Sequence, residues 1–406
     1  MSDSLKDRYP DALMNTFGPP KLALVRGEGT HVWDEGGKEY VDLLAGIAVN
    51  SLGHGHPALV GAVTEQLQTL GHVSNFFTTG PQVELAERLL ALLGDAAAQQ
   101  GGKVFFANSG AEANEGAFKL TRRTGRTHVV VAEGGFHGRT MGALALTSKA
   151  AYREPFEPLP GDVTFVPYSD ADALAAAVTD ETAAICLEPI QGEAGVVVPP
   201  EGYLATARRV ADEHGALLWF DEVQSGIGRT GDWLAHLRHG VVPDVVTLAK
   251  GLGGGFPIGA VIGLGRAADL LQPGNHGTTF GGNPVSCAVA NAVLTVIQEE
   301  GLRERAQRVG SWLARELRAL AADTPAMGDV RGAGMYLGIE WVVPGDEPRP
   351  DPQAAESVVS QLKERGFLLS TDGPQHNVIK IKPPLAFDMD EAQLLCSALR
   401  RIVLSR

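Results

Sequence analysis

The sequence predicts an α/β fold, with a large domain built on a mostly parallel sheet flanked by helices and a smaller α+β domain. Short apolar runs recur through the middle of the chain, most of them unbroken, as expected for strands covered on both faces. They lie at 103–107, 127–132, 163–166, 183–187, 216–220, 245–249 and 260–264. Helical patterns at 112–123, 203–214 and 284–298 separate several of these runs. Strand–helix alternation of this kind is typical of parallel sheets.

The remaining segments predict how the chain divides. Short strands at 30–34 and 39–42 precede helices at 57–70 and 81–93. The last hundred residues give a long amphipathic helix at 303–320, strand-like pieces at 330–334, 336–340 and 378–382, and a final helix at 390–404. We therefore expect three parts. Residues 1–56 form an N-terminal segment that contributes to the small domain, 57–298 form the large domain, and 299–406 form the C-terminal small domain.

Composition excludes several classes of partner. The 406 residues carry a formal net charge of −14, and an acidic surface repels nucleic acid and anionic membranes, so we expect neither as a partner.

The three cysteines are too far apart for a metal site or a disulfide framework, which favours a cytoplasmic location. They are Cys186, Cys287 and Cys396. The polar segment 1–10 predicts no signal peptide. His54 and His56 lie in a glycine loop without a nearby acid or cysteine, so we expect no metal.

In parallel sheets, ligands bind beyond the carboxyl ends of the strands, so the residues that follow each apolar run are candidate site residues. Ser109, Gly110 and Ala111 follow the first run and begin a helix. Free N–H groups there suit a phosphate, although taken alone the segment better fits a capped helix that binds nothing. Phe136 and Arg139 follow the second run. They suit a flat ring and a carboxylate, or else a packed aromatic and a solvated arginine.

Later strand ends add charged groups. Glu188 and Glu193 follow the run at 183–187, and alone they fit a loop of exposed acids. Asp221 ends a hydrophobic run, so it needs a cationic partner, either a protonated ring nitrogen or an arginine. Lys250 ends another apolar run before a glycine-rich stretch. A poorly solvated lysine suits covalent attachment to a carbonyl, whereas an isolated lysine more often extends to solvent.

Taken together, these strand ends offer a phosphate cradle, a ring-stacking aromatic, a buried acid and an amine. Pyridoxal 5'-phosphate asks for all four, through its phosphate, flat ring, pyridine nitrogen and aldehyde. The sequence therefore predicts a pyridoxal-phosphate enzyme.

Six segments make the chain similar to a known family, the class III pyridoxal-phosphate-dependent aminotransferases, which have the fold type I architecture. The resemblance runs from about Leu22 to Leu404. The segments that carry it are NSGAEANE (108–115), FHGRT (136–140), EPIQGEAGV (188–196), DEVQSGIGRTG (221–231), TLAKGLGGGFPIGA (247–260) and HGTTFGGNP (276–284).

The resemblance implies a role for each matching residue. Lys250 resembles the lysine that carries the cofactor and later moves the proton, and Asp221 resembles the carboxylate that keeps the pyridine nitrogen protonated. The remaining cofactor-binding positions that it implies are Ser109, Gly110 and Ala111 at the phosphate, Phe136 on the ring, Gln224 beside the ring hydroxyl, Glu188, and Thr279 at the phosphate of the partner subunit's cofactor. A homodimer with shared active sites follows from the last of these.

Within the family, the chain most resembles the acetylornithine aminotransferases, on the block LLAGIAVNSLGHGHP (43–57). Ile47 stands where ornithine aminotransferases carry a tyrosine, Arg139 matches the arginine that binds the donor's α-carboxylate, and Glu193 matches a glutamate that switches position between the two substrates. Lys380 departs from the pattern, because ornithine-type enzymes carry an arginine there for the 2-oxo acid. Its segment looks more like alanine–glyoxylate aminotransferases and phospho-lyases. Phe77 stands where some relatives have tyrosine.

The expected reaction is a ping-pong transfer between a small-molecule amino donor and a 2-oxo acid. The resemblance implies N-acetylornithine and 2-oxoglutarate, giving N-acetylglutamate semialdehyde and glutamate, a step of arginine biosynthesis. Alternatives are 4-aminobutyrate, acetyl-lysine or alanine–glyoxylate transamination, or elimination of phosphate from a phosphorylated amine. A nucleotide-dependent dehydrogenase is disfavoured because no G-x-G-x-x-G follows an early strand. A non-catalytic binding protein is disfavoured because Lys250, Asp221 and Arg139 are all retained.

Overall fold

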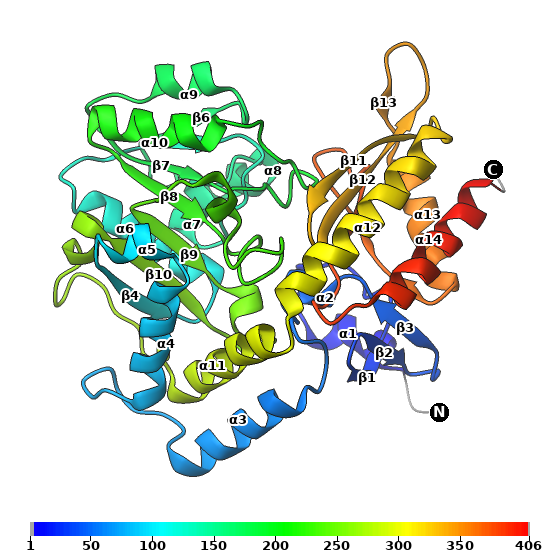
Figure 1. Cartoon of the computed structure of the whole chain (residues 1–406), viewed down its shortest axis with the longest axis horizontal. Coiled ribbons are helices and arrows are strands. Elements are labelled where there is room, and N and C mark those ends of the chain that lie inside the picture. The colour runs from blue at the N-terminus through cyan, green and yellow to red at the C-terminus, as the bar shows by residue number, and fades with distance from the viewer. Residues whose placement is uncertain (1–3, 405–406) are drawn as a thin grey trace.

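The fold of residues 4–404 comes from a computed structural model, and the two ends, 1–3 and 405–406, lie outside the described residues. Its largest element is a seven-stranded sheet in the order β4-β10-β9-β8-β7-β5-β6 (Figure 1). The strands are β4 (Gly102–Ala107), β5 (His128–Ala132), β6 (Val163–Val166), β7 (Thr182–Leu187), β8 (Leu217–Asp221), β9 (Val245–Leu248) and β10 (Gly259–Leu264). All seven predicted runs are therefore strands. β10 runs antiparallel to β4 and β9, whereas the other pairings are parallel, so the prediction of a mostly parallel sheet is confirmed.

Helices cover both faces of this sheet, which explains why its strands are apolar along their whole length. Successive residues of a strand point to opposite faces. On β8, Leu218 packs in a buried cluster with Leu204 of α10 (Tyr203–His214). Its neighbour Trp219 packs on the other side with Ala117 of α6 (Gly110–Arg122). Because α6 starts directly after β4, its N-terminus lies at the carboxyl end of that strand.

Further helices lie around this sheet, and two short ones lie near the N-terminal strands (Figure 1). α11 (Pro284–Glu299) packs against α3 (Pro57–Thr69) and α4 (Gly80–Ala91) at one side of it. The shorter helices are α1 (Leu5–Ala12), α2 (Ala45–Ala48), α5 (Asp95–Ala98), α7 (Met141–Ala145), α8 (Ala150–Arg153) and α9 (Ala171–Ala177), with 3₁₀ turns η1 (Glu154–Phe156), η2 (Ala235–His239), η3 (Lys250–Leu252) and η4 (Gly265–Asp269).

A second sheet lies beside the first and is built from the C-terminal part of the chain. It contains β11 (Met327–Ala333), β12 (Tyr336–Val343), β16 (Val378–Ile381) and β15 (Ser370–Asp372) in that order, with β13 (Arg349–Pro350) paired to β12. The helices α12 (Leu302–Ala322), α13 (Pro352–Glu364) and α14 (Met389–Leu404) lie beside it (Figure 1). The sequence predicted α12, α14, β11, β12 and β16, but α13 and β15 were not anticipated.

A third, four-stranded sheet joins the two ends of the chain. Its order is β1 (Leu24–Glu28), β2 (His31–Asp34), β3 (Glu39–Asp42) and β14 (Phe367–Leu368). β14 pairs in parallel with β3, so residues near 41 and 367 are neighbours in space. The predicted division at 56/57 and 298/299 remains a prediction. Among the residues that the structure describes, no helix is both long and apolar enough to cross a membrane.

Candidate active site

A cavity of about 400 Å³ lies at the carboxyl ends of the strands of the seven-stranded sheet. It is lined by residues that follow β4, β5, β7, β8 and β9 along the chain. The predicted site residues among them are Ser109, Gly110, Ala111, Phe136, Arg139, Glu188, Asp221, Gln224 and Lys250. Most of the residues singled out along the sequence are thus brought to one place, because parallel strands end at the same edge of a sheet.

Lys250 reaches the cavity from the first residue of η3, directly after β9. Its backbone has φ of +40°, a left-handed conformation that is uncommon for a residue with a side chain and costs on the order of 1–3 kcal/mol. Burial lowers the pKa of its amine, with further lowering from the charge on Lys380, although Glu193 and Asp221 oppose this shift. A larger share of uncharged amine than an exposed lysine has is therefore available at neutral pH.

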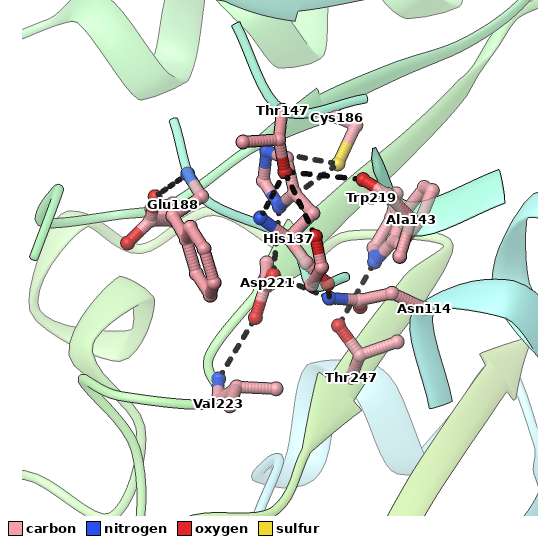
Figure 2. Close-up of polar contacts among 12 residues, drawn as sticks. Asn114, His137, Ala143, Thr147, Cys186, Glu188, Trp219, Asp221, Val223 and Thr247 are labelled. Atoms are coloured by element: carbon pink, nitrogen blue, oxygen red, sulfur yellow. Dashed lines mark hydrogen bonds and ion pairs between the residues drawn. The ribbon is translucent and has the colours of Figure 1, made fainter. Parts of the chain in front are cut away.

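Asp221 is the last residue of β8 and is held by three hydrogen bonds (Figure 2). Its Oδ2 accepts from Asn114 Nδ2 at 2.8 Å and contacts His137 Nδ1 at 2.7 Å, and its Oδ1 accepts from the backbone N–H of Val223 at 3.0 Å. The carboxylate is almost fully buried, yet it lines the cavity. Its position is therefore fixed by three elements of the fold before any ligand binds.

His137 lies behind Asp221 and is itself buried (Figure 2). Burial opposes a charge on this ring, but Cys186 and then Asp221 outweigh it and raise the pKa of His137 well above its usual value. The contact with Asp221 Oδ2 therefore favours the protonated ring and fixes its orientation behind the carboxylate. The backbone N–H of His137 donates to Thr147 Oγ1 at 3.0 Å, which anchors the loop that also carries Phe136 and Arg139.

Glu188 fixes that loop from the side of β7. One carboxylate oxygen accepts from the backbone N–H of Phe136 at 2.9 Å, and the other accepts from the backbone N–H of Gly192 at 3.0 Å. Burial raises the pKa of Glu188 to about 7. Because Phe136 is held by its backbone, its ring is positioned as one wall of the cavity.

The N-terminus of α6 forms another wall. Ser109 caps the helix by accepting from the backbone N–H of Glu112 at 3.1 Å. Within residues 4–404, the N–H groups of Gly110 and Ala111 have no acceptor, and both residues line the cavity. Backbone packing is close here, since a Cβ on Gly110 would meet the side chain of Val223 at 2.8 Å. Unpaired N–H groups at a helix start attract an anion.

Gln224 and Asn114 each present an unsatisfied oxygen. The Oε1 of Gln224 and the Oδ1 of Asn114 are buried without a hydrogen-bond partner among the described residues, and both side chains line the cavity. Buried polar atoms without partners are uncommon in folded proteins, so these two oxygens indicate the place of a bound ligand.

Arg139 lines the cavity but is exposed, and its guanidinium lies on an aromatic side chain. Its Cζ is 3.5 Å from the centroid of the Tyr152 ring and 5.6 Å from that of Phe136. A guanidinium stacked on an aromatic face is oriented by it and keeps its N–H edge free for a carboxylate.

Four predicted residues lie outside this cavity. Glu193 lines a neighbouring cavity of about 400 Å³ that shares Phe136 as a wall. Lys380 is fully buried, with its Nζ 3.0 Å from Glu193 Oε1. Thr279 is exposed and lines a third cavity. Ile47 is half exposed in the α2 segment, with φ of +67°, and within one chain it lines none of these three cavities.

The sequence reasoning missed several residues around the site. His137 and Asn114 stood inside the quoted motifs, but their contacts with Asp221 were not predicted. Asp221 lies 84 residues from His137 and 107 residues from Asn114 in the chain. Tyr152 stood in no motif, and Asp372 and Lys382 stood in the segment 371–385, in which only Lys380 was singled out. The one available signal concerned Lys382, which lies two residues after Lys380 on an expected strand. Alternate residues of a strand share a face, so the two lysines could have been expected to lie side by side.

Comparison with known proteins places the chain in a family. The class-III aminotransferase family matches residues 14–403. The chain belongs to this family. It is 54% identical to an acetylornithine aminotransferase from Streptomyces coelicolor, over 99% of this chain and 96% of that protein.

Solved structures agree with the aminotransferase assignment. The acetylornithine aminotransferase of Elizabethkingia anophelis is similar at a TM-score of 0.84 and 35% identity, covering 98% of this chain and 97% of that one. An amine transaminase from an uncultivated Pseudomonas species, in a form with pyridoxal phosphate bound, is similar at a TM-score of 0.88 and 30% identity, covering 97% and 98%. The predicted fold, enzyme class and cofactor are confirmed.

The site of this aminotransferase fits pyridoxal phosphate on its own chemistry. Free N–H groups at the start of α6 suit the phosphate, the Phe136 ring suits a flat heterocycle, and the unpaired oxygen of Gln224 suits a hydroxyl. Asp221 offers a fixed negative charge and Lys250 an amine in the same cavity. In the described part of the chain, no group of three or more metal-binding side chains is found.

Proposed function

We propose that this aminotransferase uses N-acetylornithine as amino donor and 2-oxoglutarate as acceptor, giving N-acetylglutamate semialdehyde and glutamate in arginine biosynthesis. The observation that carries the chemistry is that Lys250 and Asp221 line one cavity with the free start of α6. The substrate assignment is supported by the 54% identity to the Streptomyces coelicolor enzyme over nearly the whole chain.

Each residue of the cavity has a proposed role toward the cofactor. Bound pyridoxal phosphate supplies an electron sink that stabilises the charge left when the donor carbon loses its proton. Asp221 holds a proton on the pyridine nitrogen, which strengthens that sink. The phosphate is bound by the N–H groups after Ser109, at Gly110 and Ala111. Phe136 stacks on the ring, Gln224 accepts from the ring hydroxyl, and Glu188 fixes the loop that carries Phe136.

Lys250 is the base and acid of the proposed reaction. Its Nζ would hold the cofactor covalently when no substrate is bound, and it would be a free amine once the donor takes its place. Because burial lowers its pKa, the free amine would take up the proton that the donor carbon loses and pass it to the cofactor carbon that carried the aldehyde, and it would move a proton in the reverse direction to the carbon of the 2-oxo acid.

Arg139 is the proposed binding group for the donor's α-carboxylate, through the edge that its stacking on Tyr152 leaves free. Glu193 and Lys380 act on the acceptor. Lys380 and Lys250 lower the pKa of Glu193 to about 2 although burial opposes this, so Glu193 stays charged until an anionic substrate replaces it at Lys380. Ile47, which closes no wall of the cavity in one chain, is proposed to contact the donor's acyl end only in the assembled enzyme.

We also propose a cytoplasmic homodimer with shared active sites. Thr279 lies on a loop that Asn75 joins to the 75–77 segment, through bonds to the carbonyl oxygens of Thr278 and Gly281. Three large aromatic side chains on these two segments are exposed, namely Phe76, Phe77 and Phe280. Such an apolar patch is typical of a subunit interface. A partner seated there would place Thr279 at the other subunit's phosphate.

The substrate proposal is tested by single half-reactions. Cofactor-loaded enzyme is mixed with N-acetylornithine, ornithine, acetyl-lysine, 4-aminobutyrate or alanine, without an acceptor, and the cofactor's absorbance is followed. We expect N-acetylornithine to convert the cofactor fastest. Faster conversion by another amine would overturn the donor assignment while leaving the aminotransferase chemistry intact. Release of phosphate from a phosphorylated amine, without an oxo acid, would instead identify elimination.

A further inference from the structure

Two cationic side chains, Arg139 and Lys149, lie against the same aromatic ring. The Cζ of Arg139 is 3.5 Å from the centroid of the Tyr152 ring, and the Nζ of Lys149 is 4.6 Å from that centroid. Lys149 also donates a long hydrogen bond of 3.3 Å to the Tyr152 hydroxyl. Arg139 lines the cofactor cavity, whereas Lys149 and Tyr152 line the cavity of about 400 Å³ that shares Phe136 with it. One ring therefore holds two positive charges where the two cavities meet.

The backbone also ties these two side chains together. Lys149 is the residue before α8, and it follows Ser148. The Oγ of Ser148 accepts from the backbone N–H of Gly134 at 2.8 Å, at the start of the loop that carries Arg139. The position of Lys149 relative to Arg139 is therefore set by hydrogen-bonded chain on both sides, and not by the Tyr152 ring alone.

Neither cation has a carboxylate partner. Among residues 4–404, no carboxylate oxygen lies within 4 Å of a charged nitrogen of Arg139 or Lys149. Glu193 and Asp372 line the cavity beside Lys149, but both contact the Nζ of Lys380, Glu193 at 3.0 Å.

The charge of Lys149 is available to a ligand for two reasons. The side chain is only partly buried, so its ammonium group stays in contact with water while its stem packs on the protein. The guanidinium of Arg139 is close by, and two like charges near one another repel unless an anion lies between them. In a chain with a net charge of −14, two neighbouring cations without a carboxylate leave a place for an anionic ligand.

Both proposed substrates carry a carboxylate that is remote from the reacting carbon. N-acetylornithine reacts at the carbon of its free amine, and its α-carboxylate lies several bonds away. 2-Oxoglutarate reacts at its keto carbon, and its second carboxylate lies at the other end of the molecule. Arg139 is the proposed contact for the first of these carboxylates, and the same position suits the second, because a short carbon chain separates carboxylate and reacting carbon in both substrates.

We propose that Lys149 is a second carboxylate-binding residue of this enzyme, which together with Arg139 holds the remote carboxylate of the donor and of the acceptor. Arg139 offers a planar set of N–H donors, and Lys149 adds a point charge from the neighbouring cavity. This inference rests on the proposed function, since it takes N-acetylornithine and 2-oxoglutarate as substrates. Its consequence is that Lys149 favours substrates with the remote carboxylate over similar molecules without it.

The test removes the charge of Lys149 and compares matched substrates. The second-order rate constant of each half-reaction is measured by absorbance for wild type, Lys149→Met and Lys149→Arg. N-acetylornithine is paired with N-acetylputrescine, and 2-oxoglutarate with 2-oxopentanoate, which carry a hydrogen atom or a methyl group in place of the remote carboxylate. We expect Lys149→Met to lower the rate constant roughly fivefold or more only for the member with that carboxylate, as for loss of one charge-assisted contact. Lys149→Arg keeps the charge and should stay close to wild type.

A binding measurement tests the same contact without turnover. Glutarate carries both carboxylates of 2-oxoglutarate but no keto group, and its Kd for the holoenzyme is measured by calorimetry. Lys149→Met should raise this Kd roughly fivefold or more. Lys38→Met is the matched control, because the Nζ of Lys38 also lies over a tyrosine, 5.1 Å from the centroid of the Tyr40 ring, but Lys38 lines neither cavity. It should leave the rate constants and the glutarate Kd unchanged.

The inference would be overturned by an equal loss for both members of a pair, by no loss in Lys149→Met, or by the same loss in Lys38→Met. Failure of the proposed function gives a different result. Faster conversion of the wild type by another amine, or by a 2-oxo acid other than 2-oxoglutarate, would overturn the substrate assignment alone. The glutarate Kd would then still decide the role of Lys149, since that measurement depends on neither substrate.

Discussion

Asp221→Asn removes one negative charge from the cofactor cavity while keeping nearly the same side-chain shape. An asparagine can keep the hydrogen bonds from Asn114 and His137 if its carbonyl oxygen takes the place of Oδ2. Its NH₂ group then faces the backbone N–H of Val223, which loses its acceptor. An unsatisfied buried donor costs about 1–3 kcal/mol, so we expect the free energy of unfolding to fall by this amount and the fold to survive.

The expected effect on catalysis is larger than the effect on stability. The lost charge is one that the fold holds in place before reaction, and removing one preorganised electrostatic group costs roughly 10²–10³-fold in rate, or about 3–4 kcal/mol. The assay is a stopped-flow half-reaction of cofactor-loaded enzyme with saturating N-acetylornithine. We expect the rate constant of Asp221→Asn to fall by this factor while the cofactor remains bound.

Glu222→Gln is the matched control. Glu222 is the next residue, is equally buried, and accepts from Ser225 Oγ at 2.6 Å and from the backbone N–H of Ala235 at 3.0 Å, but it does not line the cavity. This change should lower stability and leave the half-reaction rate near that of the wild type. A rate within threefold of wild type for Asp221→Asn, or an equal loss in both variants, would refute the assigned role of Asp221.

Further predictions concern Lys250, Tyr152, Glu188 and Thr279. Lys250→Ala should abolish borohydride-fixed cofactor, checked by mass spectrometry, and retention of covalent cofactor would overturn the assignment. Tyr152→Leu should raise the KM for the donor by roughly two- to thirtyfold with little change in kcat, because it removes a cation–π contact of about 0.5–2 kcal/mol. Tyr152→Phe keeps the ring and should therefore keep the wild-type KM in steady-state assays. An equal rise in KM for both variants would exclude an effect through the ring face. The pKa of Glu188 is raised from 4.5 to about 7 in the folded protein, so its contribution to stability is present below pH 4.5 and is lost as the pH rises through 7, by roughly 3 kcal/mol. Urea titrations of cofactor-free protein should show the free energy of unfolding falling across that pH range. Glu188→Gln should remove this dependence on pH. Hybrid dimers that combine a Lys250→Ala subunit with a Thr279→Ala subunit should keep one intact site, because with shared sites both changes fall on the same site. Fluorescence titration should therefore show one site with wild-type cofactor affinity, and two weakened sites would contradict sharing.

The apolar pattern of the sequence was sufficient to predict the large sheet, because strands covered on both faces must be apolar throughout. The runs from Lys103–Ala107 to Ala260–Leu264 therefore appear as β4 to β10, with shifts of about one residue at their ends. The helices α12 and α14 were predicted for a different reason, because each buries one face and its apolar residues recur with the helical period. It did not distinguish the direction of β10, since a short strand buried on both faces has the same composition whether it runs parallel or antiparallel. β14 and β15 were missed because they are only two and three residues long, too short for any period to be read.

For the site, the sequence determined which chemical groups the chain offers, because each stands directly after an apolar run and parallel strands end at one edge. Lys250, Asp221, Phe136 and the start of α6 were predicted on that ground and lie around one cavity. Only the tertiary structure decided what surrounds them. The contacts of His137 with Asp221 and of Glu193 with Lys380 join segments 84 and 187 residues apart in the chain. Such contacts depend on which strands lie side by side within a sheet and on how two separate sheets pack, and no local pattern in the sequence records that arrangement.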